Sequence, residues 1–359
     1  MTSGHTTLDR SDLILLGGGG AAVVLAGLAH YAGWSDAVAF VLSGIAVTAL
    51  ASLVGRSVEQ LGDRFGPGAT GVLQSALGNL PELFISLFAL KAGLVGVVQA
   101  ALIGSILANL LLVMGIAFVV GGVKHGSQSI DSQRARSIST LMIVAVVAMV
   151  FPSLAHWIDS PASSHEKALS DIAAVILLAL FALSLPASLK RGSDLNSPMA
   201  HEAEPPRWPV SLAVAMLAAA GLAAAFVSDW FVAALEPAMA AWHISDAFAG
   251  LVIVAIAGNA IENVVGVQLA ARNQSDYAFS LIINSPLQIA LALAPALVIL
   301  SQVLGFTTLT LVFSPMLVVA VFLAVLIAVV ITVDGESNWL EGAALIGVYG
   351  VIATSFWWG

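Results

Sequence analysis

Long apolar segments recur along nearly the whole chain, separated by short polar turns. Each segment has about 18 residues or more, enough for a helix to cross a hydrocarbon core of about 30 Å. The pattern predicts an all-α polytopic membrane protein with about eleven transmembrane helices: Leu13–Ala29, Ala37–Val54, Gly71–Leu90, Leu94–Val120, Ser137–Ile158, Ala168–Leu185, Val210–Ala234, Ala247–Ala271, Tyr277–Val303, Leu309–Val333 and Trp339–Phe356. The first run is longer than a usual signal-peptide core and has no clear cleavage site, so we expect a retained helix.

Positive charges gather on one side of this predicted topology. With the N-terminus in the cytoplasm, ten of the twelve Lys and Arg residues lie on the cytoplasmic side: Arg10, Arg56, Arg64, Lys124, Arg134, Arg136, Lys190, Arg191, Arg207 and Arg272. Only Lys91 and Lys167 lie outside. Because short cytoplasmic loops carry an excess of Lys and Arg, we expect a cytoplasmic N-terminus and an external C-terminus. The small size and the absence of a targeting segment favour a prokaryotic plasma membrane.

The two halves of the chain repeat each other at a fixed spacing. Four residues of the first half recur 180 positions later, where Gly78, Asn79, Glu82 and Ser105 return as Gly258, Asn259, Glu262 and Ser285. Five spans lie in each half, and an odd number requires the second half to enter the membrane in the opposite orientation. We therefore expect a 1 + 5 + 5 organisation with two inverted-topology repeats. It comprises an N-terminal tail and first helix at 1–35, repeats at 36–189 and 210–359, and a polar cytosolic linker at 190–209.

Composition narrows the classes of partner. The chain is 59% hydrophobic and 9% charged, with a net charge of -9 and no cysteine. This composition excludes a soluble globular domain. It predicts that the chain contacts the lipid bilayer and does not bind nucleic acid. No zinc-protease motif or pairing of a nucleophile with a base is present, so an enzyme is the least favoured class. No bound cofactor is expected, and the sequence does not indicate an oligomeric state.

Two acidic residues lie within predicted membrane helices. Glu82 and Glu262 occupy matching positions in the third and eighth spans. A central charged side chain costs about 2.5 to 3.5 kcal/mol on translocon scales, so each glutamate needs a proton or a cation to compensate it. Substrate sites of inverted-repeat transporters lie near the midplane where the repeats meet. We therefore expect the two glutamates to face each other and to be compensated by protons, a cation or both.

Neutral oxygens surround both glutamates in the sequence. Candidate side-chain ligands share a helix face with a glutamate or lie on the following helix: Asn79, Asn259, Ser105, Asn109, Ser285 and Gln288. Pro81 and Pro286 lack an N–H, so the carbonyls of Leu77 and Ile282 should lose their helical partners. With the flexible Gly78 and Gly258, they are candidate backbone ligands, although interhelical hydrogen bonds or simple kinks would also explain these residues.

The predicted ligand set consists entirely of oxygen. Calcium takes six to eight oxygen ligands, whereas zinc and copper favour histidine and cysteine. The seven histidines lie in loops or near span ends, away from the glutamate motifs. The residues therefore predict a calcium site that also exchanges protons.

The motifs resemble those of the calcium/proton exchanger family within the cation/calcium exchanger superfamily. The matching segments are GNLPELF from Gly78, GNAIEN from Gly258, GSILANLLLVMG from Gly104, SPLQIALALAP from Ser285 and DGESNWLEG from Asp334. The resemblance implies one extra helix before two five-helix repeats, cation binding by Glu82 and Glu262, and antiport of calcium against protons by alternating access. Asn79 and Asn259 replace the Thr-Ser pair typical of sodium/calcium exchangers, which favours protons as counter-ions.

The second motif departs from the family pattern. Asn263 stands where the family usually has histidine, and Asn284 to Gln288 replace its Gly-Ser-Ala-Thr-Gln. The acidic helix of the family's linker is reduced to Glu202 and Glu204. These departures leave open a sodium or potassium/proton antiporter, or one for a broader set of divalent cations. A passive cation channel, which would also use an oxygen-lined pore, is a less favoured alternative.

Overall fold

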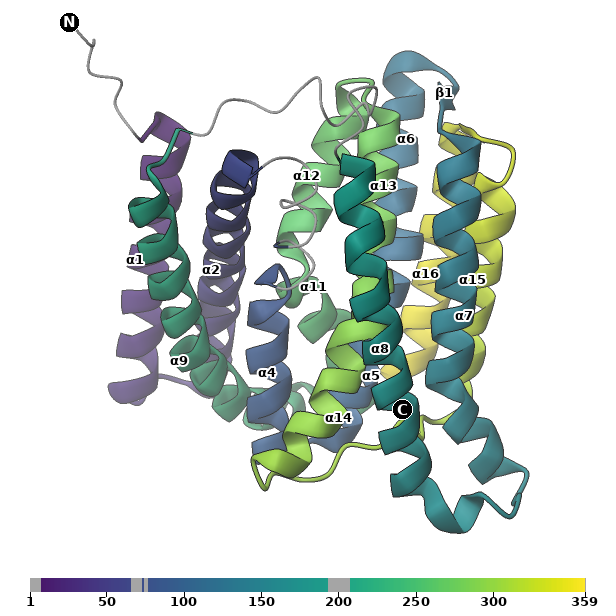
Figure 1. The fold of residues 1–359 in the computed structure, drawn as a ribbon. Helices are drawn as coiled ribbons and strands as arrows, with labels where there is room; N and C mark the ends of the chain where they lie inside the picture. The colour runs from purple at the N-terminus through teal and green to yellow at the C-terminus, as the bar shows by residue number, and fades with distance from the viewer. Residues whose placement is uncertain (1–7, 66–72, 74–76, 193–206, 359) are drawn as a thin grey trace, which may run out of the picture. The chain divides into compact units, whose positions relative to one another are not determined.

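The chain folds almost entirely into helices (Figure 1). The computed structural model describes residues 8–65, 73, 77–192 and 207–358, and describes only the backbone of 63–65, 133–134, 186–192 and 260–262. In the described part of the first half, the elements are α1 (Arg10–Tyr31), α2 (Asp36–Phe65), α4 (Leu80–Lys91), α5 (Val95–Leu107), η1 (Ala108–Val113), α6 (Met114–His125), β1 (Gln128–Ser129), α7 (Ser132–Trp157), η2 (Ser163–His165) and α8 (Glu166–Gly192).

The second half contains a matching series. Its elements are α9 (Val210–Trp242), α10 (Asp246–Phe248), η4 (Ala249–Val254), α11 (Ala255–Gly258), α12 (Ala260–Ala271), α13 (Ser275–Gln288), η5 (Ile289–Leu293), α14 (Ala294–Val303), α15 (Pro315–Thr332), β2 (Glu336–Ser337) and α16 (Trp339–Trp357). Helices α4 and α12 both have 12 residues, and each bound is displaced by 180 positions. Gly93 and Asn273, also 180 apart, follow them with positive φ. The sequence repeat is therefore a repeat of structure.

Most predicted spans are confirmed as helices. Among the described residues, nine helices are long and apolar enough to cross a membrane, or ten if the bent pair Asp246–Gly258 and Asn263–Ala271 forms one span. The predicted third span, Gly71–Leu90, includes residues outside the described part of the chain, so the count of eleven stays a prediction. The linker residues 193–206 also lie outside it.

One predicted span begins too early. Leu309–Val333 was expected to be helical throughout, but α15 starts at Pro315, with Ser314 as its N-cap. Leu311 and Phe313 precede it in a non-helical segment although both are buried. Side chains supply its hydrogen bonds, because Ser170 Oγ accepts from the Leu311 N–H at 3.0 Å and Ser153 Oγ accepts from the Phe313 N–H at 2.9 Å. Hydropathy cannot distinguish this segment from a helix.

The chain divides into two compact units that do not coincide with the sequence repeats. Unit 1 comprises Met1–Phe88 and Ala182–Ala241, and unit 2 comprises Ala89–Phe181 and Trp242–Gly359. The units group helices by contact in space, whereas the repeats follow the order of the sequence. The predicted domain boundaries therefore stay predictions.

Unit 1 is built on the packing of α1 along α2, and side chains of α9 contact α2. Val54 and Val58 of α2 form a buried cluster with Ala220 of α9. The rings of Phe40 and Phe231 stack 4.9 Å apart nearer the other end of the same pair. Helix α1 packs along α2, and all three helices lie together in Figure 1.

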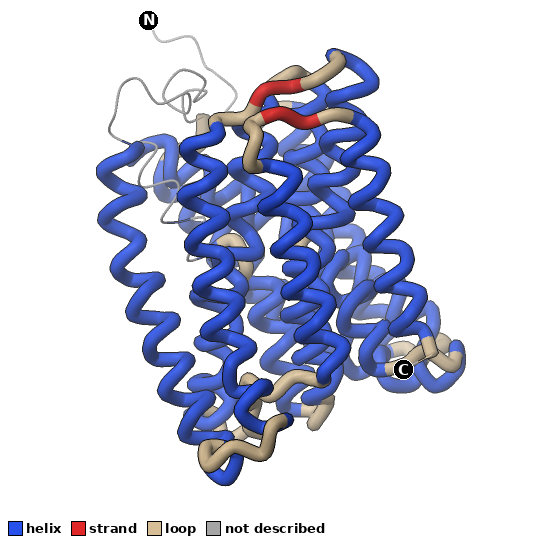
Figure 2. Tube along the Cα trace, turned by 90° about the vertical axis from the view of Figure 1, so that its right-hand side faces the viewer, coloured by secondary structure: helices blue, strands red, loops and turns tan. Residues whose placement is uncertain are grey.

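Unit 2 has a helical core closed at one end by two short strands. Helix α5 packs against η4, α6 against α16, α12 against α13, and α7 against α15. The strands β1 and β2 pair in antiparallel register, with Gln128 opposite Ser337 (Figure 2). This pairing joins the loop after α6 to the loop before α16.

Candidate cation site

The first glutamate motif contains a break in its helix. Gly78 and Asn79 form a turn, and α4 begins at Leu80. Pro81 is the second helical residue, a position where the missing N–H costs no helical hydrogen bond. The helix is therefore interrupted before the proline, at Gly78 and Asn79, which fits the expected backbone break and not the alternative of a simple kink. Glu82 is the third residue of α4, and its side chain is fully buried.

The second motif has the same local construction. Helix α11 ends at Gly258, and Asn259 separates it from α12 with non-helical angles of φ −104° and ψ 25°. The segments before and after this break differ in direction by 62°. Glu262 is the third residue of α12, as Glu82 is of α4. Its side chain lies outside the described residues, so the expected pairing of the two glutamates stays a prediction.

The helix breaks affect the electrostatics of the motif. The unpaired N–H groups of a helix's first turn carry partial positive charge, which stabilises an anion close to them. Glu82 lies in this first turn while being fully buried. The break therefore places the buried Glu82 carboxyl group beside the positive end of α4.

Buried neutral side chains meet around Asn259 in unit 2. The Asn259 Nδ2 atom donates to Ser105 Oγ at 2.9 Å and to the Ala255 carbonyl at 3.0 Å. Its Oδ1 atom accepts from Ser285 Oγ at 3.1 Å. Ser105 lies on α5 and Ser285 on α13, so one asparagine connects the two serines that the repeat places in equivalent positions.

Asn109 completes this network from η1. Its Nδ2 atom lies 2.9 Å from the Ser105 carbonyl, 3.3 Å from Asn259 Oδ1 and 3.4 Å from Ser285 Oγ. The side chain is fully buried, and Asn109 Oδ1 accepts no hydrogen bond from any residue that the structure describes. A buried oxygen without a donor is unfavourable, and a cation would satisfy it.

The structure therefore unites four of the predicted ligands and leaves the others untested. Asn109, Asn259, Ser105 and Ser285 form one network, which we call the Asn259 network. Half-buried Gln288 ends α13, and half-buried Asn79 lies at the break before α4. The carbonyls of Leu77, Gly78, Gly258 and Ile282 remain candidate ligands. Pro286 lies inside α13 without ending it, so the helix continues past the position where the Ile282 carbonyl is expected to lack a partner.

The described residues include three π-helical turns that were not predicted from the sequence. The turns η1, η4 and η5 interrupt otherwise α-helical spans, and η1 and η5 lie about 180 residues apart. Such turns insert an extra residue and often occur at functional sites. Asn109 lies in η1, which thus belongs to the site. Polar residues inside an apolar span are the only sequence signal for it.

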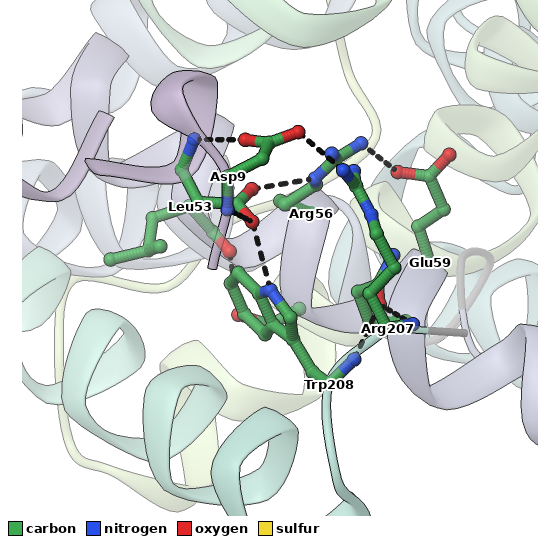
Figure 3. Close-up of polar contacts among 9 residues, drawn as sticks. Asp9, Leu53, Arg56, Glu59, Arg207 and Trp208 are labelled. Atoms are coloured by element: carbon green, nitrogen blue, oxygen red, sulfur yellow. Dashed lines mark hydrogen bonds and ion pairs between the residues drawn. The ribbon is translucent and has the colours of Figure 1, made fainter. Parts of the chain in front are cut away.

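A second polar cluster lies in unit 1 and also escaped sequence reasoning (Figure 3). Asp12 is 1% exposed; its Oδ1 atom lies 3.2 Å from Arg56 Nε, and its Oδ2 atom accepts from Trp208 Nε1 at 3.0 Å. Gln60 Oε1 accepts from the backbone N–H of Trp208 at 3.0 Å. Arg207 forms an ion pair with Asp9. The cluster joins α1, α2 and the segment before α9, and it holds no ligand predicted for the cation.

Comparison with known proteins matches most of the chain to one protein family. The family described as "Sodium/calcium exchanger protein" matches residues 35–190 and 212–358. "Ca(2+)/H(+) antiporter ChaA" of Bacillus subtilis (strain 168) is 38% identical over 352 residues, which cover 97% of this chain and 99% of the relative. The "Ca(2+)/H(+) antiporter" of Synechocystis sp. (strain ATCC 27184 / PCC 6803 / Kazusa) is 34% identical over 349 residues, covering 91% and 93%.

Solved structures agree with this grouping. The structure of native YfkE is similar with a TM-score of 0.81 and 36% identity, covering 96% of this chain and 99% of that one. The crystal structure of the H+/Ca2+ exchanger CAX has a TM-score of 0.76 at 16% identity, covering 97% and 92%. The second likeness concerns the fold alone. Together these likenesses identify the fold as that of membrane exchangers.

Proposed function

The chain belongs to the sodium/calcium exchanger protein family, and we propose that it is an integral membrane calcium/proton antiporter. Three relatives at 34% to 38% identity are named Ca(2+)/H(+) antiporters. The observation that carries the proposal is the fully buried Glu82 at the start of α4, in a motif whose counterpart holds the Asn259 network. A buried carboxyl group and neutral oxygens suit a hard cation and protons.

The coupling follows from charge. With Glu82 and Glu262 both ionised, the site holds two negative charges, which one calcium ion or two protons neutralise. Both loaded states can cross the low-dielectric barrier, whereas the empty, doubly charged state pays a large desolvation cost. Calcium therefore leaves the cytoplasm as protons enter, and alternating exposure of the site to the two sides carries the exchange.

The proposed ligand roles rest on the sequence repeat and on the Asn259 network. Glu82 and Glu262 bind the cation and carry the protons. Asn109 contributes its buried Oδ1 atom, and the remaining neutral oxygens come from Asn79, Asn259, Ser105, Ser285 and Gln288. When calcium binds, the hydroxyls of Ser105 and Ser285 exchange hydrogen bonds within the Asn259 network for contact with the ion. In the proton-loaded state these side chains keep their hydrogen bonds to one another, at the 2.9 to 3.4 Å seen here, and only the Asn109 Oδ1 atom of the network lacks a donor among the described residues.

The proposed orientation places the N-terminus in the cytoplasm and the C-terminus outside, in the plasma membrane of a prokaryote. Two contacts within unit 2 support the predicted placement of its loops on alternate sides of the membrane. His125 Nε2 lies 3.0 Å from the Ala271 carbonyl, which brings together the loops after the fourth and eighth predicted spans. Lys167 Nζ donates to Gln302 Oε1 at 2.6 Å, which brings together the loops after the fifth and ninth. Each pair lies on one side in the predicted topology.

Calcium-dependent proton flux in proteoliposomes tests this function. With an imposed pH gradient, the native chain should release protons when calcium is added on the opposite side. Glu82→Gln and Glu262→Gln should each abolish that flux, because an amide carries neither the charge nor the proton. Glu336→Gln, which changes an exposed residue of β2, is the matched control and should keep the native rate. Undiminished flux in both site variants would overturn the proposed mechanism.

The alternatives give different results in the same vesicles. A sodium or potassium/proton antiporter would move protons when either monovalent ion replaces calcium, and those ions would compete with calcium uptake. A passive channel would carry calcium after the pH gradient is collapsed, without proton movement. Calcium uptake that depends on the gradient and resists competition by sodium and potassium distinguishes the proposed antiporter from both.

A further inference from the structure

A groove lies on the surface of unit 2 between α7 and α15, which pack side by side (Figure 1). Its volume is about 210 Å³ at the end nearer the β1–β2 strands. There α7 contributes Arg136, Ser139 and Thr140, while α15 and the residue after it contribute Val329 and Val333. This end of the groove is therefore polar on one wall and apolar on the other.

The groove continues along the same two helices with a purely apolar lining. The second part has a volume of about 80 Å³ and is lined by Val146 and Val147 of α7 and by Phe322, Val325 and Leu326 of α15. Ile143 lines both parts and makes them one continuous surface, which we call the α7–α15 groove. A ligand that fills it must have a polar head and an apolar chain.

The polar end has two groups that lack partners of their own. Arg136 is exposed and forms no ion pair with any residue that the structure describes. The Ser139 side chain is 4% exposed, and no described residue exchanges a hydrogen bond with its hydroxyl. Thr140 differs, because its hydroxyl donates to the Arg136 carbonyl at 2.8 Å. A guanidinium beside a buried hydroxyl donor matches a phosphate oxygen in both charge and hydrogen bonding.

The length of the groove matches one leaflet of a bilayer. Val147 lies 11 residues beyond Arg136 on α7, which corresponds to about 16 Å along the helix axis. Half of a hydrocarbon core of about 30 Å is close to this distance. Arg136 is in the second turn of α7, near the end of a predicted span, where lipid head groups lie. The acyl chain of a lipid held at Arg136 would thus reach the end of the apolar lining.

We propose that the α7–α15 groove is a binding site for one anionic phospholipid. Its phosphate is held by the Arg136 guanidinium and the Ser139 hydroxyl, and one acyl chain lies along Ile143 and Val147. A soluble phosphate would leave the apolar part uncovered. A second copy of the chain would need an acidic group opposite Arg136 and an apolar ridge of matching length, whereas a phospholipid supplies both parts in one molecule.

Lipid retention tests the site without reference to transport. The full chain is purified from vesicles of phosphatidylcholine and phosphatidylglycerol, and bound lipid is counted by native mass spectrometry. One phosphatidylglycerol should remain bound through mild delipidation. Arg136→Gln should weaken its retention by about five-fold, the effect of one cation at an anionic surface. Lys124→Gln, an exposed cation of α6 outside the groove, should change nothing.

A second pair of variants probes the apolar part. Ile143→Trp fills the groove where its polar and apolar parts meet and should expel the lipid. Val144→Trp changes the adjacent exposed residue, and this variant should keep the lipid bound. Equal retention of phosphatidylcholine and phosphatidylglycerol, or displacement of the lipid by inorganic phosphate, would overturn the proposal. The proposal would also be overturned if Ile143→Trp turned an oligomer into a monomer without loss of lipid, because a second copy of the chain would then be the occupant of the α7–α15 groove.

Discussion

Asn259 Nδ2 and Ser105 Oγ lie 2.9 Å apart, although they come from different halves of the chain. The sequence repeat pairs Asn259 with Asn79 and Ser105 with Ser285, so this hydrogen bond crosses from one repeat to the other. The same asparagine accepts from Ser285 Oγ at 3.1 Å. The conserved spacing of 180 residues thus brings equivalent polar groups into one buried network.

Asn259→Ala should reduce both stability and calcium affinity. It removes one hydrogen bond each from Ser105 Oγ and Ser285 Oγ, and a lost hydrogen bond of this kind costs about 0.5 to 1.5 kcal/mol. It also removes an amide oxygen from the proposed ligand set. Thermal unfolding in detergent with and without calcium measures both effects, and the stabilisation that calcium gives should fall along with the melting temperature.

Ser153→Ala is the matched control for this loss. Ser153 Oγ is also fully buried; it donates to the Leu311 carbonyl at 3.0 Å and accepts from the Phe313 N–H. Its removal should lower the melting temperature by a similar amount while leaving the calcium-dependent increase intact. If both variants lose that increase equally, the Asn259 network has no particular role in binding the cation.

Gly104→Ala should destabilise unit 2, because its helices approach there without room for a side chain. A Cβ atom on Gly104 of α5 would overlap the backbone carbonyl of Leu251 in η4. The contact is reciprocal, since a Cβ on Gly250 would overlap the carbonyl of Val97. Overpacking typically costs about 1 to 3 kcal/mol. We expect a lower melting temperature and slower calcium transport, measured in detergent and in vesicles respectively.

Gly20→Ala in α1 provides the comparison. An added Cβ at Gly20 meets no atom within 4 Å. Alanine is favoured over glycine within a helix by about 1 kcal/mol, so this variant should be as stable as the native chain or more so. A stable, active Gly104→Ala protein would mean that α5 and η4 can separate at no cost.

Polar residues at repeated positions could be found from the sequence, whereas the contacts that they make between helices could not. Glu82, Asn259 and Ser105 follow from apolar segments, spacing and the cost of polar groups in a membrane. The hydrogen bond that joins Asn259 to Ser105 does not, because a linear pattern fixes spacing within a helix and leaves contacts between helices open. The choice between a break and a simple kink at Pro81 stayed open for a related reason, since proline suits both a kink inside a helix and a first turn.

The π-helical turns and the unit 1 cluster show the same limit. The apolar run through η1 has no periodic feature that distinguishes a π-helical turn from an α-helix. Trp208 lies near the end of the predicted polar linker at 190–209, where nothing in the sequence indicates a buried indole. Its full burial depends on Asp12 and Gln60, which are distant in the chain.

Asp12→Ala should destabilise unit 1 strongly. Its carboxylate accepts hydrogen bonds from Arg56 and from the buried Trp208 indole, so removing it leaves both donors without that partner (Figure 3). Breaking a buried ion pair costs about 3 to 5 kcal/mol; because Arg56 is 24% exposed, we expect the lower end of this range. Tryptophan fluorescence during denaturation measures the loss, although several other tryptophans contribute to the signal.

Glu59→Ala serves as the control, since Glu59 also pairs with Arg56, at 3.1 Å, but is 53% exposed. An exposed ion pair contributes about 0.2 to 1 kcal/mol. Trp208→Phe isolates the indole hydrogen bond while keeping most of the apolar volume. A loss for Asp12→Ala no greater than that for Glu59→Ala would show that the carboxylate is solvated instead of buried.

The ion pair between Asp9 and Arg207 should persist into acid solution. The Asp12 backbone N–H and, next, the Arg207 guanidinium hold the pKa of Asp9 well below its usual range. A lowered pKa in the folded state stabilises the fold at every pH above the unfolded value of about 3.9, and this contribution is lost as the pH falls through the folded pKa. The difference in melting temperature between the native chain and Asp9→Asn should therefore be constant from neutral pH to about pH 5 and shrink below about pH 4.

Arg207→Gln separates the two causes of the lowered pKa. It removes the guanidinium but keeps the backbone hydrogen bond from Asp12, so the Asp9 pKa should rise only part of the way to its usual value. The carboxyl-carbon chemical shift of Asp9 in the native chain and this variant reports the two titrations directly. An Asp9 carboxyl that titrates near pH 4 in the native chain would show that the segment before α9 is not held to α1 by this contact.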